Sequence, residues 1–116
     1  MKAIESDDPR AWFVKAEADL LSAEILLQSG APVTGMVCYH CQQSAEKFLK
    51  GYLTFHQMKF KWVHDLEYLI ELCAVGDDQF NELKPIAACR RAESPGGDQA
   101  MARGLLHRGQ RNGLPL

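Results

Sequence analysis

Apolar residues recur at helical spacing along most of this chain. Between residues 9 and 29 they follow one another mainly at intervals of three and four, which places them on one side of a helix. This stripe consists of Trp12, Phe13, Ala16, Leu20, Ala23, Leu26 and Leu27. Asp8 and Pro9 form a helix-start signal, and Gly30 with Pro32 forms the matching stop. The pattern therefore predicts a first helix over residues 9–29 with one side facing a core.

A second helix is predicted from its cap, Thr34, to about Gln57. Its core-facing side consists of Cys38, Cys41, Ala45, Phe48, Leu49 and Tyr52. Gly51 lies in its interior, where glycine is weakly disfavoured unless another group packs close to it. Glu46 and Lys50 are four residues apart, and we expect them to form an i, i+4 ion pair that needs no function.

The pattern of residues 58–89 predicts a linker followed by two shorter helices. The linker, residues 58–63, combines lysines with aromatic residues as Lys59-Phe60 and Lys61-Trp62. A third helix is expected from residue 64 or 65 to 75. A fourth is expected from residue 77 or 78 to about 89, with Pro85 kinking it or splitting off its first turn. Because strand-like alternation is lacking, the predicted fold class is all-α, with residues 1–89 forming one helical domain.

The composition fits one small domain and narrows the range of partners. The 116 residues are 47% hydrophobic, and 13 Lys and Arg against 15 Asp and Glu give a net charge of -2. Such a chain has no overall positive field for nucleic acid, so that contact stays open and would be local. The longest apolar stretches cover a few residues, whereas a membrane-spanning helix needs about 20. With no secretory leader pattern, we expect a cytoplasmic protein that does not contact a membrane.

Four cysteines lie in the predicted helices, at positions 38, 41, 73 and 89. Cys38 and Cys41 have the spacing of a metal or redox motif, but a zinc site needs four ligands and a second such pair is missing. We expect the thiols to be reduced and packed in the core, with no metal and no cofactor. A metal or redox role for the pair is the alternative.

Two groups of polar residues are candidates for ligand binding. His40, Gln43 and Lys47 share one face of the second helix, where an imidazole, an amide and an ammonium would suit a phosphate or a nucleotide. A solvated face, or a polar strip in a helix–helix dimer interface, explains the same spacing. His64 and Asp65 join an imidazole to a carboxylate, although a loop-fixing hydrogen bond and a favourable helix start explain them as well.

The run CYHCQQSAEKFLKGYL, residues 38–53, followed by WVHDLEYLIEL, resembles the HEPN family (higher eukaryotes and prokaryotes nucleotide-binding). The resemblance covers residues 10–89 and implies an up-and-down helical bundle with a four-helix core. In this family the bundle commonly pairs with itself, and bacterial members are often associated with a minimal nucleotidyltransferase, including in toxin–antitoxin systems. The resemblance thus implies a non-catalytic interaction module that forms a homodimer, engages a nucleotidyltransferase and is a candidate for nucleotide binding.

Two other functions remain open. Many HEPN proteins resemble metal-independent ribonucleases whose Arg and His are separated by four to six residues. Here Arg103 and His107 have only three residues between them, so we expect no catalytic residues. The first alternative is a ribonuclease toxin whose motif is missing from this chain. The second is a stand-alone nucleotide-binding protein that uses the five polar candidates.

The last residues differ in character from the rest of the chain. From residue 90 onward the chain has five glycines and two prolines and shows no clear apolar period, which predicts an irregular or disordered tail over residues 90–116. We therefore expect the bundle to lack its usual last helix. Apolar surface left uncovered in this way would make the chain an obligate oligomer or poorly stable.

The tail also suggests a reading-frame hypothesis. One choice of codons for residues from about 90 onward, read one nucleotide later, encodes a segment similar to the tyrosine-containing loop of the HEPN family. We predict that sequencing the coding DNA will reveal a single-base change that restores this frame. The hypothesis fails when no single-base change does so.

Overall fold

The computed structural model describes residues 8–31, 34–88 and 95–115, and it is helical without strands in these ranges. Its elements are α1 (Pro9–Gln28), α2 (Thr34–Phe55), α3 (Leu66–Ala74), the 3₁₀ helix η1 (Asp78–Leu83), α4 (Lys84–Ala87) and α5 (Pro95–Arg111). The predicted all-α class is confirmed.

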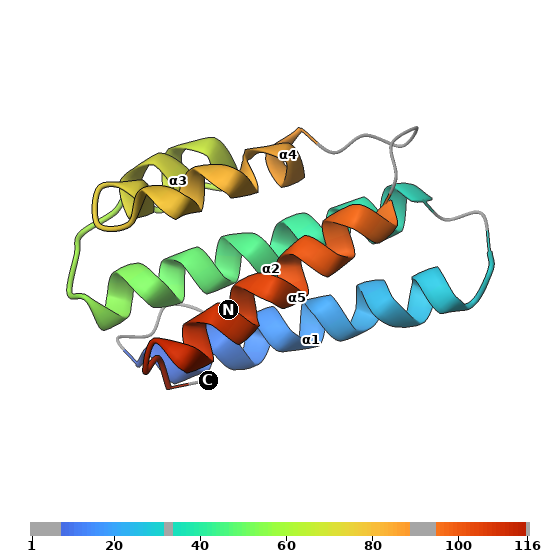
Figure 1. Ribbon diagram of the computed structural model, residues 1–116, viewed down its shortest axis with the longest axis horizontal. Coiled ribbons are helices and arrows are strands. Elements are labelled where there is room, and N and C mark those ends of the chain that lie inside the picture. The colour runs from blue at the N-terminus through green and yellow to red at the C-terminus, as the bar shows by residue number, and fades with distance from the viewer. Residues whose placement is uncertain (1–7, 32–33, 89–94, 116) are drawn as a thin grey trace.

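The helices form a bundle around α2 (Figure 1). Helix α1 packs along α2 and runs antiparallel to it, and α5 packs against both. Helix α3, η1 and α4 cover another side of α2. The main core consists of Phe13, Ala16, Leu20, Ala45, Phe48, Leu49, Leu53, Leu69, Ile70, Cys73, Phe80, Leu83, Ile86, Ala102, Leu105, Leu106 and Leu114.

The helix starts follow from local side-chain caps. The carboxylate of Asp8 accepts a hydrogen bond from the Arg10 backbone N–H at 3.0 Å, and that of Asp65 accepts one from the Tyr68 N–H at 3.1 Å. The fourth predicted helix is divided as expected near Pro85, because η1 gives way to α4 one residue before it. These boundaries are set by residues next to one another in sequence.

Two details of the predicted core are wrong. Leu27 is 37% exposed although it lies on the same side of α1 as Leu20 and Ala23, because it is in the last turn and α1 ends one residue later. Cys38 is buried as expected but is disulfide-bonded, which departs from the expectation of reduced thiols. Cys89 lies outside the described residues.

The expectation of an irregular tail is wrong for Pro95–Arg111, which form α5. Ala102, Leu105, Leu106 and Gly109 follow an i, i+3, i+4, i+7 pattern and are all buried. The helix ends in a Schellman motif, in which Gly113 has a φ of 85° and the Leu114 N–H bonds the Gly109 carbonyl at 3.0 Å. Tertiary packing and this terminator outweigh the low helix propensity of the glycines.

Helix α5 is also attached to α1 by charge. The Arg103 guanidinium donates to the carboxylates of Glu17 and Glu24, with the shortest contacts at 3.0 Å and 2.8 Å. A helix therefore occupies the place on the bundle that we expected to be empty. The instability or obligate oligomerisation that we inferred from an uncovered core therefore no longer follows. The reading-frame hypothesis stays a prediction.

Helices α1 and α2 approach closely at Gly51. A Cβ added there would lie 2.6 Å from Cε1 and 2.9 Å from Cδ1 of Phe13, whose ring is buried against Phe48. Glycine in this helix interior is thus explained by close packing, the condition that the sequence left open.

We predict that Gly51→Ala will lower the free energy of unfolding by about 1–3 kcal/mol, because the buried Phe13 ring must shift and this outweighs the gain in helix propensity. Gly104→Ala is the matched control, since Gly104 is exposed in α5 with nothing within 4 Å of an added Cβ. It should stabilise the protein by about 0.5–1 kcal/mol. Urea denaturation measures both, and a neutral or stabilising Gly51→Ala would contradict the packing described.

Candidate functional site

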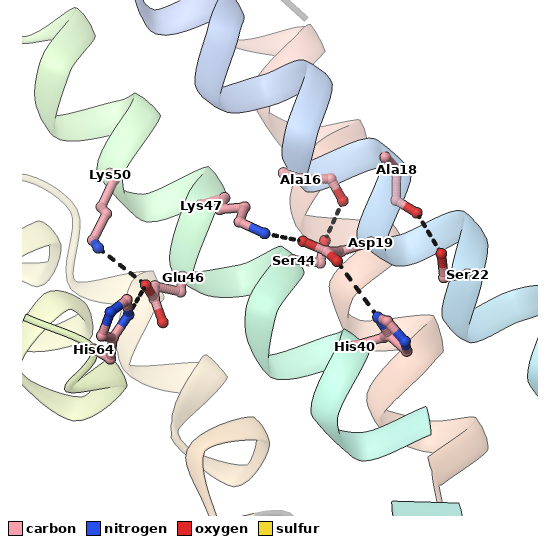
Figure 2. Close-up of polar contacts among 10 residues, drawn as sticks. All are labelled: Ala16, Ala18, Asp19, Ser22, His40, Ser44, Glu46, Lys47, Lys50 and His64. Atoms are coloured by element: carbon pink, nitrogen blue, oxygen red, sulfur yellow. Dashed lines mark hydrogen bonds and ion pairs between the residues drawn. The ribbon is translucent and has the colours of Figure 1, made fainter. Parts of the chain in front are cut away.

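A polar junction joins α1 to α2 at Asp19. The Lys47 ammonium donates to Asp19 Oδ2, and His40 Nδ1 lies 3.4 Å from Asp19 Oδ1 (Figure 2). Side-chain exposures are 15% for Lys47, 17% for Asp19 and 21% for His40. About one turn earlier in α1, the Ser44 hydroxyl donates to the Ala16 carbonyl at 2.8 Å. Two of the predicted site residues therefore hold the two long helices together.

A second polar cluster joins α2 to the loop before α3. Glu46 Oε2 accepts a hydrogen bond from the Lys50 ammonium at 3.0 Å and lies 2.8 Å from His64 Nδ1 (Figure 2). Glu46 and Lys50 are 6% and 4% exposed in their side chains, whereas His64 is 84% exposed. The expected i, i+4 ion pair between Glu46 and Lys50 is confirmed, and the structure adds that both of its charges are buried.

The Lys50 ammonium also lies against two indole rings. Its Nζ is 5.6 Å from the ring centroid of Trp12 in α1 and 5.7 Å from that of Trp62 in the linker. The two rings are 5.9 Å apart. A cation over an indole face is attracted by the ring quadrupole, most strongly when water is excluded. Lys50 thus connects α1, α2 and the linker at one end of the bundle.

The five predicted ligand-binding residues do not form a single pocket. Gln43, His64 and Asp65 line a cleft of about 220 Å³ at the start of α3, together with the carboxylates of Glu46 and Glu67. His40 and Lys47 are not among the residues that line it. Three carboxylates at one small cleft would repel a phosphate unless a cation accompanied it. Their role in ligand binding stays a prediction.

The structure supplies residues that sequence reasoning missed. Asp19 contacts both Lys47 and His40, and its signal was a carboxylate spaced three and four residues from the core positions Ala16 and Ala23. Lys50 was seen only as half of a helical pair. Its burial depends on Trp62, which is distant in sequence, so no local pattern could reveal it.

Arg103 and His107 are brought together, but not as a free pair. Both line a cavity of about 590 Å³ between α1 and α5, with the apolar groups of Phe13 and Leu106. The hydrogen bond to Glu24 raises the pKa of Arg103 above its ordinary value. Arg103 is therefore a permanent cation whose donors are already used by carboxylates on α1.

The described residues contain no cluster of three His, Cys, Asp or Glu side chains that could hold a metal ion. Burial raises the pKa of the Cys73 thiol to about 12, and its Sγ lies 3.7 Å from the Leu49 carbonyl oxygen. This thiol is protonated at neutral pH and is a poor nucleophile. No helix in the described ranges is long and apolar enough to cross a membrane.

A comparison with protein families matches residues 9–93 to the HEPN domain. This match covers most of the chain, so the protein belongs to the HEPN domain family, and the resemblance carried by residues 38–53 and the later His-Asp-Leu is confirmed. No curated protein and no solved structure matches the chain.

We predict that Lys50→Met will lower the free energy of unfolding by about 3 kcal/mol, because it leaves the buried Glu46 carboxylate without its cation. The double variant Glu46→Gln/Lys50→Met should recover more than half of this loss, since both charges are then removed. Arg10→Met, which breaks the exposed ion pair with Asp8, is the control and should leave stability nearly unchanged. Denaturant titration measures all three. A double variant no more stable than Lys50→Met would contradict the buried-pair account.

Proposed function

We propose that this protein is a non-catalytic HEPN-type interaction module of the cytoplasm, which forms a homodimer and engages a minimal nucleotidyltransferase. The observation that carries the proposal is an exposed apolar stripe on α1, formed by Val14, Ala18, Leu21 and Ile25. Val14 is 67% exposed, Leu21 is 51% exposed and Ile25 is 58% exposed. The stripe lies on the side of α1 opposite its buried residues, and Val14 at its first position also lines the cavity between α1 and α5.

The stripe is suited to pairing with a second copy of itself. Its members are spaced by four, three and four residues, so the order is the same when it is read in reverse. In an antiparallel, two-fold symmetric pair, Leu21 would lie opposite the small Ala18 of the other copy, and Val14 opposite Ile25. A parallel pair would instead align the two alanines and leave a gap. Self-complementarity therefore favours an antiparallel homodimer.

The nucleotidyltransferase partner is inferred from membership of the family, and the geometry is compatible with a binding role. The Lys47 ammonium and the His40 ring of the first junction are already engaged, because both contact Asp19. A nucleotide phosphate would have to displace Asp19 to reach Lys47. We therefore rank nucleotide binding below protein binding for this chain.

The ribonuclease alternative is favoured by one observation, the shared cavity of Arg103 and His107. Against it stand their spacing and the two glutamates that hold Arg103. RNA cleavage by the purified protein that is lost in His107→Ala would favour this alternative over the non-catalytic module.

We predict that the protein is a dimer at micromolar concentration and that Leu21→Glu converts it to a monomer, because a charge would be buried at the centre of the α1 contact. Light scattering during size-exclusion chromatography measures the mass. Val75→Glu is the matched control, since Val75 is 80% exposed at the end of α3, and it should stay dimeric. A wild-type monomer, or a Leu21→Glu dimer, would contradict pairing through α1.

A further inference from the structure

An aromatic cleft lies at the end of α2. It has a volume of about 650 Å³ and is lined by Pro9, Thr54, Phe55, Gln57, Met58, Lys59, Phe60 and Trp62. Phe55 is 42% exposed and Trp62 is 60% exposed. Apart from Trp62, which also contacts Lys50, neither the candidate site nor the α1 stripe includes the side chains that line this cleft. The cleft is therefore a separate surface with two large aromatic groups open to solvent.

The aromatic wall is held in place rather than loose. The Trp62 ring is 5.8 Å from that of Phe60 and 5.9 Å from that of the buried Trp12, and the Lys50 ammonium lies 5.7 Å from it. The backbone beneath the cleft is fixed by a Schellman-type turn, in which Gln57 has a φ of 58° and the Met58 N–H bonds the Leu53 carbonyl at 2.8 Å. An exposed tryptophan that is already ordered binds a ligand with little further loss of entropy.

The charge beside the cleft is positive. Lys59 lines it, and Lys61, which is not part of the lining, lies between Phe60 and Trp62 in sequence; both lysines are exposed. The nearby carboxylate of Asp8 is paired with Arg10. In a chain with a net charge of -2, this local pair of ammonium groups distinguishes the cleft from the acidic cleft at the start of α3.

We propose that this cleft binds an acidic peptide segment of a partner protein, with an aromatic or aliphatic side chain of the peptide against Trp62 and Phe55 and its carboxylates near Lys59 and Lys61. Tryptophan and an apolar pocket are the usual energetic centre of such contacts. Two lysines match one or two carboxylates. A single-stranded nucleic acid carries a negative phosphate on every nucleotide, so it would need a longer row of basic side chains than these two lysines provide.

This proposal rests on the proposed function of a protein-interaction module and assigns its partner surface. The full-length protein is used to select binders from a library of short random peptides, and enriched peptides are labelled with fluorescein and titrated by fluorescence anisotropy. Enriched peptides should contain acidic residues around one apolar side chain. Their Kd should rise about tenfold in Trp62→Ala and in Phe55→Ala, as expected for residues at the centre of a contact.

Charge is tested by a matched pair of double variants. Lys59→Glu/Lys61→Glu should weaken peptide binding at least as much as Trp62→Ala, whereas Lys84→Glu/Arg111→Glu, the same charge change at exposed positions outside the cleft lining, should not. Circular dichroism confirms that each variant is folded. When Trp62→Ala is not folded, Phe55→Ala alone tests the aromatic contact. A fluorescein-labelled oligouridylate is titrated alongside.

Several results would overturn the proposal: no enriched peptide, enrichment of neutral or basic peptides, binding unchanged in folded aromatic variants, or oligouridylate binding more tightly than the acidic peptides. The proposed function is tested separately, because Leu21→Glu lies on the outer face of α1. A dimer that binds no acidic peptide would support the proposed dimeric interaction module and contradict peptide binding at the cleft. A monomeric protein that binds acidic peptides would support the cleft and contradict the proposed dimer contact through α1.

Discussion

The charge of Lys50 is held inside the bundle by Glu46 and by two indole rings, and the end of the molecule is arranged around it. Removing an ammonium and a carboxylate from water costs several kcal/mol each, so the pair persists only where other groups complete it. Here Trp12 of α1, Trp62 of the linker and His64 before α3 do so. A single cation thus brings three separate segments to one place and sets the wall of the aromatic cleft.

Two further groups of polar side chains also hold helices together. Asp19 binds Lys47 and His40 across α1 and α2, and Arg103 attaches α5 to the two glutamates on α1. Groups engaged in this way are poorly placed to act on a substrate. What the fold leaves open is apolar: the stripe on the outer face of α1 and the cleft beside Trp62. They lie on different elements of the bundle, so the proposed homodimer contact and the proposed peptide contact do not compete for the same residues.

The sequence predicted most of the fold where the determinants are local. The caps Asp8 and Asp65 and the core face of α2 depend on residues within a few positions of one another, and they are found as expected. Helix α5 was missed because glycines obscured its apolar spacing, which becomes decisive only when α1 and α2 offer a surface to bury it. The site was predicted in part. The spacing of His40 and Lys47 placed them together, but their common partner Asp19 and the burial of Lys50 arise from tertiary contacts that no local pattern contains.

The central claim is that the buried cation of Lys50 interacts directly with Trp62. A double-mutant cycle on the free energy of unfolding, with Lys50→Met, Trp62→Leu and the double variant, measures this interaction without assuming any function. The account predicts a favourable coupling of about 1 kcal/mol, the size expected for a cation against an indole that is partly shielded from water. Additive effects of the two substitutions, with a coupling indistinguishable from zero, would contradict it.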